Sequence, residues 1–266
     1  MDSALEAIQF FANSANRVRI FEALADGATT GHTLAERTGA SRSTVARILG
    51  EGESRGWIDS EGSQYDLTRV GAIMIEEFRA YLQTVQGVQH LGETVYWLPP
   101  PAQALEFRHL RDAEVITPTA TRPARPSDHV ADRLRSANEL RTLAPTGVPR
   151  LTKLCAEQSE TGQLDVRAVI GADFFHTLAT DPEVVTHWRA LAEQEDISAY
   201  DGHVPIGLHV IDQTVIIWLT ELRGGTVEVR GVLVSESPAV LSWAECLYEE
   251  YRAEAEPVDP ASLPVE

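Results

Sequence analysis

Apolar residues recur at three- and four-residue intervals through the first part of the chain, which is the spacing of helices that bury one face. This pattern predicts helices over residues 4–12, 16–25, 31–38 and from residue 42 onward. In the last of these helices, Val45, Ile48 and Leu49 share the buried side. Arg42 and Arg47 therefore point away from the core.

The residues around these helices are those of tight turns. Gly39 suits the left-handed backbone position that ends a helix, and Ser41 suits the N-cap of the next one. Residues 57–60 and 64–67, separated by Glu61-Gly62-Ser63, predict a two-stranded hairpin. Thr68 is placed to cap a long helix over residues 69–91, and two alternatives stay open for its apolar residues: packing on their own domain, or contact with a second copy of the chain.

A helix-turn-helix followed by a hairpin is the element order of a winged-helix DNA-binding domain. Small and hydroxyl side chains in the first turns of the second helix allow close approach to a groove, and Arg47 can reach a guanine edge or a phosphate. The candidate DNA-binding residues are Ser41, Arg42, Ser43, Thr44, Arg47, Arg55, Ser63 and Gln64. The alternative is a small helical bundle with a solvated polar face.

Four segments of this region resemble archaeal ArsR/MarR-type winged-helix transcription regulators, especially those of haloarchaea. They are residues 14–24 (SANRVRIFEAL), 41–47 (SRSTVAR), 55–57 (RGW) and 65–68 (YDLT). The resemblance covers about the first third of the chain. It implies a winged helix that binds double-stranded DNA and a dimer joined through the long helix.

The second part of the chain alternates strands and helices. Pro99-Pro100-Pro101 predicts a stiff connector over residues 96–101, which separates a domain of residues 1–95 from one of residues 102–257. A short helix is expected over residues 102–111, a strand over 114–118 and, after a loop over 118–126, a helix capped by Ser127. Strands are then predicted over residues 139–144, 164–170 and 197–200, with helices over 148–160, 173–179 and 183–194.

Such alternation predicts a mainly parallel sheet covered by helices. The chain then changes to an antiparallel ribbon over residues 206–211, 214–219 and 227–234, which makes the sheet mixed, and ends in an amphipathic helix after Ser237-Pro238. Residues 258–266 are expected to be a frayed acidic tail. The predicted fold class is thus an α+β winged helix-turn-helix domain followed by an α/β sensor domain with a mixed sheet.

Four segments of the second domain resemble the effector domain of the archaeal methanogenesis filament-regulator family. They are residues 141–145 (RTLAP), 166–170 (VRAVI), 204–212 (VPIGLHVID) and 243–251 (WAECLYEEY). That domain is similar to the sensor half of TrmB-like sugar regulators and to the phospholipase D fold. The resemblance implies a non-catalytic sensor.

Charge narrows the choice of environment and partners. The chain has 40 acidic and 22 basic residues, a net charge of −18, and Lys153 is its one lysine. An acidic, arginine-using composition fits a protein that stays soluble in concentrated salt, as in halophiles. The absence of a signal peptide and of a long apolar run favours a cytoplasmic protein without a membrane partner.

Enzyme chemistry is not expected. Phospholipase D catalysis needs a His-x-Lys motif, and the residue two places before Lys153 is Leu151. The histidines His176, His187, His203 and His209 lack helical metal-ligand spacing, no Walker-type phosphate loop is present, and no cofactor or metal is predicted. Cys155 and Cys246 are expected to be two buried structural thiols.

Ligands of open α/β sheets bind outside the carboxyl ends of the strands. The candidate ligand-binding residues at three such ends are Thr146, Gly147, Gly171, Asp201 and His203. We expect them to converge on one polar pocket for a phosphorylated or polyhydroxy metabolite, although each is also an ordinary turn residue. The sequence therefore predicts a dimeric, metabolite-controlled DNA-binding regulator; the alternative is an effector-free dimer whose second domain mediates oligomerisation.

Overall fold

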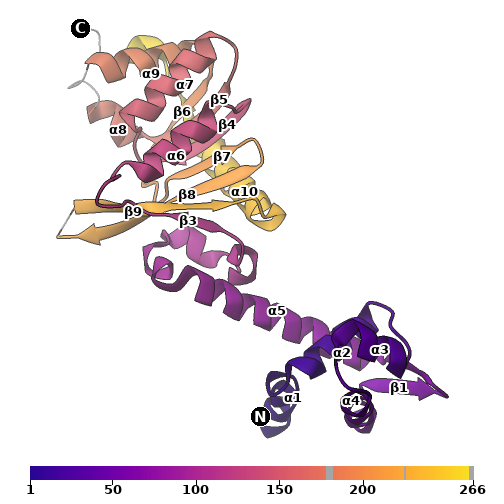
Figure 1. The fold of residues 1–266 in the computed structure, drawn as a ribbon. Coiled ribbons are helices and arrows are strands. Elements are labelled where there is room, and N and C mark those ends of the chain that lie inside the picture. The colour runs from indigo at the N-terminus through magenta and orange to yellow at the C-terminus, as the bar shows by residue number, and fades with distance from the viewer. Residues whose placement is uncertain (178–181, 225, 264–266) are drawn as a thin grey trace. The chain divides into compact units, whose positions relative to one another are not determined.

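The computed structural model describes residues 1–177, 182–224 and 226–263 of the chain (Figure 1). It divides into two compact units, Met1–Gln83 and Thr84–Glu266. The boundary between these units falls inside the long helix α5 (Arg69–Leu91), whereas the sequence places the domain boundary at residues 96–101. The prolines there open a 3-10 helix instead of an extended connector, and Leu98 and Ala102 are buried in the core of the second unit.

The first unit consists of short helices and one hairpin. Its elements are α1 (Asp2–Ala12), α2 (Ala15–Ala25), α3 (Gly31–Thr38), α4 (Arg42–Ser54), β1 (Ile58–Glu61), β2 (Gln64–Leu67) and the start of α5. Aromatic rings fill its centre: Phe11 stacks on Trp57 with ring centroids 5.6 Å apart and lies 5.0 Å from Phe78. These rings are buried, and they join α1, the hairpin and α5.

The turns of this unit are those expected from the sequence. Gly39 has φ +69° at the end of α3, a conformation that costs glycine no steric penalty. The Ser41 hydroxyl accepts a hydrogen bond of 3.2 Å from the Thr44 amide at the start of α4. The Thr68 hydroxyl accepts a bond of 3.0 Å from the amide of Gly71 at the start of α5. Each cap satisfies a backbone donor that the helix itself leaves free.

Helix α5 has apolar side chains on more than one side. Ile75 and Phe78 are buried in the first unit, and Met74 and Leu82 pack against the same core. The side chains of Val70, Ile73 and Tyr81 are 50–58% exposed. The apolar pattern of this helix is therefore only partly explained by packing within its own unit.

The second unit contains an eight-stranded mixed sheet with the order β10-β6-β5-β4-β7-β8-β9-β3. Its strands are β3 (Glu114–Ile116), β4 (Glu139–Ala144), β5 (Asp165–Gly171), β6 (Asp196–Tyr200), β7 (Leu208–Ile211), β8 (Thr214–Arg223), β9 (Thr226–Ser235) and β10 (Glu256–Pro257). Strand β5 pairs parallel with β4 and β6, and every other pairing in the described sheet is antiparallel. The expectation of a mixed sheet is confirmed, with a shorter parallel part than the alternation suggested.

Helices cover both faces of this sheet (Figure 1). One face packs against α6 (Arg125–Leu134), α7 (Pro149–Glu160) and α9 (Pro182–Gln194). The other packs against α10 (Pro238–Glu254) and the 3-10 helices η1 (Gly92–Trp97), η2 (Pro100–Ala104) and η3 (Phe107–Leu110). Most side chains on both faces of the central strands are apolar because helices cover both faces.

Four local expectations differ from the structure or reach past its described part. The helix expected over residues 102–111 is the pair η2 and η3, and Ser127 lies inside α6, whose N-cap is Ala124. The expected frayed tail is ordered as far as described: residues 260–262 form a turn, and Leu263 is buried against the core. The helix predicted over 173–179 corresponds to α8 (Ala172–Thr177), and its last two positions lie outside the described residues.

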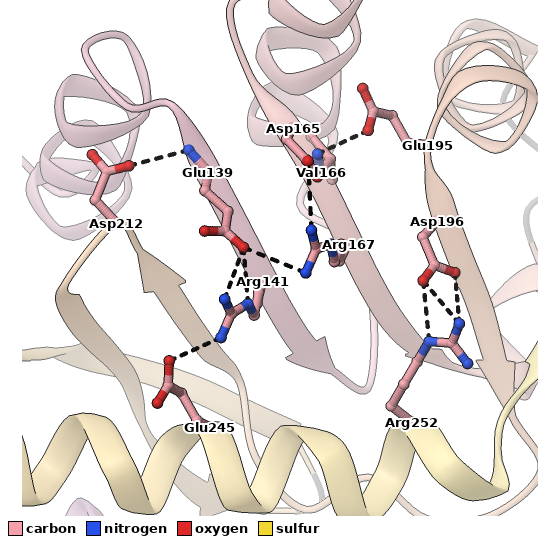
Figure 2. A network of polar contacts seen from close by, with 10 residues as sticks. All are labelled: Glu139, Arg141, Asp165, Val166, Arg167, Glu195, Asp196, Asp212, Glu245 and Arg252. Carbon is pink, nitrogen blue, oxygen red and sulfur yellow. Dashed lines mark hydrogen bonds and ion pairs between the residues drawn. The ribbon is translucent and has the colours of Figure 1, made fainter.

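Ion pairs join strands β4 and β6 to helix α10 (Figure 2). The Arg141 guanidinium donates to Glu139 at 3.0 Å and to Glu245 of α10 at 2.9 Å. Arg252 of α10 donates to Asp196 of β6 at 2.8 Å. This network fixes α10 across the parallel part of the sheet.

None of the described helices combines the length and hydropathy that a membrane span requires.

Candidate functional sites

The predicted DNA-binding residues lie at the surface of the first unit. All eight are exposed except Thr44, which is half-buried. The side-chain oxygens of Ser41 and Thr44 lie 2.8 Å apart, and those of Ser41 and Ser43 lie 3.0 Å apart. The start of α4 thus presents three hydroxyls and the side chain of Arg42, for which no ion-pair partner occurs among the described residues.

Arg47 has an ion-pair partner on its own helix. Its guanidinium lies 2.5 Å from Glu51, which also receives a hydrogen bond of 2.7 Å from Arg17. Burial alone would raise the pKa of Glu51, but the bonds from Arg47 and Arg17 outweigh it and lower that pKa. Glu51 is therefore ionised near neutral pH and holds Arg47 along the surface of α4.

The other predicted residues have mixed environments. The Arg55 guanidinium lies 4.9 Å from the ring centroid of Phe10 and 5.3 Å from that of Trp57, so it covers the aromatic core. Ser63 lies in the hairpin turn and Gln64 opens β2, where it bridges to Thr30. Arg17 donates to the Phe10 carbonyl at 2.9 Å and so connects α2 to α1.

A cavity of about 340 Å³ lies in the second unit, between one face of the sheet and helices α7 and α9. Two predicted ligand-binding residues, Thr146 and Gly147, line it. Gly171 lies beside Pro145: a Cβ on Gly171 would be 3.1 Å from the Pro145 carbonyl oxygen. Asp201 and His203 are exposed and are absent from the described lining.

This cavity differs from the single polar pocket expected at the strand ends. The cavity is lined mainly by apolar side chains, and none of its described lining residues is an Asp, Glu, Lys or Arg. It extends under α7 because the strands present small side chains there, Ala144 and Ala168 among them. A ligand site for Asp201 and His203 stays a prediction.

Three polar side chains from neighbouring strands form a chain in the cavity wall. The Trp218 indole N–H donates to His209 Nε2 at 2.8 Å, and His209 Nδ1 lies 2.7 Å from the Thr142 hydroxyl. That hydroxyl is 3.1 Å from the Leu208 carbonyl oxygen. Because the indole can only donate, the proton of the neutral imidazole sits on Nδ1 and the hydroxyl donates to the carbonyl. Every member is satisfied with the imidazole neutral.

The environment of His209 keeps it neutral. Burial lowers the pKa of His209 to about 4, since the imidazolium form would lose its hydration in the apolar wall. Protonation at Nε2 would also remove the acceptor of the Trp218 N–H. At neutral pH the cavity therefore has an uncharged polar wall.

The two cysteines have opposite environments. Cys155 of α7 is buried in the cavity wall, and burial raises the pKa of its thiol to about 12, which leaves it protonated and poorly nucleophilic. Cys246 is exposed on α10, so the expectation of two buried thiols is wrong for this residue. It follows Glu245, whose side chain is turned toward Arg141, and lies on the outward side of the helix.

The cavity was not predictable from spacing along the chain. Thr142 and His209 lie 67 positions apart and meet because β4 and β7 pair antiparallel in this register. The sequence showed His209 only as a neighbour of His203. The available signal was a histidine and a tryptophan on strands whose other buried residues are mostly aliphatic.

Two family models match separate parts of the chain. Residues 5–90 match the model described as the HVO_A0261 N-terminal domain. Residues 123–254 match the model described as the middle domain of the methanogenesis regulatory protein FilR1. No curated protein matches the sequence.

Several solved structures align with the chain at low sequence identity. The archaeal chromatin protein TrmBL2, described as showing a novel mode of DNA binding, is 14% identical over 95% of this chain and 99% of its own, with a TM-score of 0.42. The phospholipase D family member Nuc of Salmonella typhimurium is 13% identical over 55% of this chain and 99% of its own, at 0.44. NucT of Helicobacter pylori is 10% identical with the same two coverages and TM-score.

Proposed function

We propose that this chain is a DNA-binding transcription regulator whose first unit is a winged helix. The observation that carries the proposal is helix α4, which follows α3 through a tight turn, precedes the β1–β2 hairpin and turns hydroxyls and arginines outward. Helices in this position enter the major groove by their first turns. The match of residues 123–254 to the middle domain of a methanogenesis regulatory protein supports the assignment.

Ser41, Arg42, Ser43 and Thr44 are the proposed groove contacts at the helix start, with Arg47 one turn further on. To reach a base or a phosphate, Arg47 must break its ion pair with Glu51 or keep it while contacting the DNA as well. Arg55, Ser63 and Gln64 are the proposed backbone contacts at the edge of the domain and on the wing. The acidic surface elsewhere repels DNA, which concentrates binding on this face.

A homodimer is part of the proposal. The exposed apolar side chains of Val70, Ile73 and Tyr81 recur along α5 at three- and eight-residue steps and leave an apolar stripe in water. A second copy of the same helix is the proposed partner. A dimer would present two α4 helices to two half-sites.

The second unit is the proposed sensor, in which a small ligand controls operator binding. Its support is the cavity beside Thr146 and Gly147. The alternative is an effector-free dimer in which this unit serves oligomerisation only. A ligand that shifts both the melting temperature and the DNA affinity separates the two, because coupling between sites is reciprocal.

Substitution of Arg47 tests the DNA-binding proposal. Arg47→Ala should weaken specific DNA binding by about 1–3 kcal/mol, measured by fluorescence anisotropy on fragments selected from genomic DNA. The fold should remain, since an exposed ion pair on one helix contributes at most about 1 kcal/mol.

Arg37→Ala is the matched control, because Arg37 lies on the neighbouring helix α3 with only a weak 3.4 Å contact to a backbone carbonyl. It should bind nearly as well as the unmodified protein. Full affinity in a folded Arg47→Ala variant would remove Arg47 from the site, and failure of the unmodified chain to select any DNA would remove the proposed function.

A further inference from the structure

The cavity in the second unit has a definite chemistry. Its volume of about 340 Å³ is at the lower end of the range of small-molecule sites. Two indole rings, Trp188 and Trp218, contribute to its lining, and most of the remaining surface is aliphatic. Flat aromatic groups pack well against such rings.

Charge selects against anions at this site. No described lining residue is an arginine or a lysine, and His209 is held neutral by its bonds to Trp218 and Thr142. A phosphate or carboxylate entering the cavity would lose its hydration without gaining a cation. The net charge of −18 opposes its approach as well.

Two hydroxyls remain for a polar ligand group. Thr146 and Thr220 line the cavity, and neither side chain has a hydrogen-bond partner among the described residues. Both can donate and accept. The internal chain of Trp218, His209 and Thr142 leaves one further lone pair, on the Thr142 oxygen.

We propose that this cavity binds an uncharged aromatic molecule that carries at least one hydroxyl or amide group. The aromatic body lies between the sheet and α7, against the indole rings, and the polar group bonds to the threonine hydroxyls. This inference rests on the proposed sensor role of the second unit and replaces the phosphorylated or polyhydroxy ligand expected from the sequence.

Exposed residues on one wall of the cavity can be replaced by larger ones to test the proposal. Val227 and Val229 of β9 line the cavity and are 64% and 47% exposed, so larger side chains there do not disturb the core. Leu222 of β8 is 72% exposed, pairs with Val227 across the same ribbon and is absent from the described lining. Val229→Trp should therefore fill the cavity mouth, and Leu222→Trp is its matched control.

The test uses calorimetric titration of the full chain with three probes of one size range: 1-naphthol, 1-naphthyl phosphate and glucose. Naphthol should bind in the micromolar to millimolar range, with naphthyl phosphate and glucose at least about tenfold weaker. Val229→Trp should lower naphthol affinity by about tenfold or more, and Leu222→Trp should leave it unchanged. Thr146→Phe fills the cavity from another lining position, after β4, and repeats the test if Val229→Trp is poorly folded by circular dichroism.

Three results would overturn the inference: no naphthol binding, equal or tighter binding of naphthyl phosphate or glucose, or naphthol affinity unaffected by both filling variants. Failure of the proposed function is a separate result, because DNA binding is measured on the same protein without probe. Naphthol that binds as expected but leaves DNA affinity unchanged supports the cavity assignment and argues against ligand control.

Discussion

At the scale of single residues, the histidine in the cavity wall leads to a prediction of how the free energy of unfolding depends on pH. The pKa of His209 is about 4 in the folded chain, and that of an unfolded histidine is about 6.5. The free energy of unfolding that His209 contributes is thus fully present above pH 6.5. It is lost as pH falls through the window from about 6.5 to about 4, because only the unfolded state takes up the proton there.

The loss should be on the order of 3 kcal/mol across that window. His209→Gln, whose amide can still accept from Trp218 and donate to Thr142, should flatten the curve of unfolding free energy against pH. His203→Gln, at an exposed site, should leave it as steep as before. Urea denaturation at a series of pH values measures all three proteins, and equal slopes for all three would contradict the assignment.

A residue's conformation can be predicted from the sequence where its cause is local. The sequence predicts Gly39, Ser41 and Thr68 as turn and cap residues, and their backbone angles and hydrogen bonds agree. Cys246 could not be assigned in the same way, because the exposed side of α10 depends on where that helix docks on the sheet.

At the scale of elements, helix α5 begins with a close backbone contact. A Cβ on Gly71 would lie 2.0 Å from the carbonyl oxygen of Trp57, so the helix can approach the hairpin only with glycine at this position. Gly71→Ala should destabilise the first unit by about 1–3 kcal/mol through overpacking. Thermal unfolding followed by circular dichroism measures the change.

Gly50 of α4 provides the matched control. A Cβ there would meet nothing within 4 Å, and the residue is exposed. Gly50→Ala should stabilise the helix by about 0.5–1 kcal/mol, so the same substitution has opposite signs at the two glycines. A stable Gly71→Ala protein would mean that the hairpin yields at little cost.

The exposed stripe on α5 gives a second prediction at this scale. Ile73→Glu should dissociate the proposed dimer, since a carboxylate would be buried without a partner at the centre of the stripe. Light scattering coupled to gel filtration measures the mass. Glu76→Gln, on an exposed position of the same helix, should have no such effect, and an unchanged mass for Ile73→Glu would place the dimer contact elsewhere.

Elements with a strong local pattern were predicted closely: β4 and α3 have the bounds expected from alternation and caps. The structure of residues 100–110 was not predicted correctly, because proline at the start of a 3-10 turn is compatible with a packed segment as well as with a linker. The cavity depends on strand register between β4, β7 and β8, which a single sequence does not contain.

At the scale of the whole molecule, charge should control stability. The first unit has 12 acidic and 8 basic residues, and the remainder of the chain has 28 and 14. Repulsion between the excess acidic side chains extends to about 10 Å or more at low ionic strength. Each exposed ion pair, in contrast, contributes at most about 1 kcal/mol to the free energy of unfolding. The melting temperature should therefore rise as potassium chloride increases toward molar concentration.

A double substitution checks the cause. Glu249→Gln with Glu250→Gln removes two exposed charges from α10 and should raise the melting temperature in dilute buffer while reducing its dependence on salt. A melting temperature that falls with added salt would show that ion pairs such as Arg252–Asp196 dominate over repulsion, and would count against a halophilic protein.

The contrast between the two thiols supplies a built-in reporter. A maleimide dye should attach to native protein at Cys246 alone, because Cys155 is buried with a protonated thiol. Slower modification of Cys155 by a small disulfide reagent would then time the openings of α7 above the sheet. A ligand bound in the cavity should slow this modification of Cys155. The rate of modification at one sulfur atom therefore reports both the motion of the helix and the presence of a ligand beneath it.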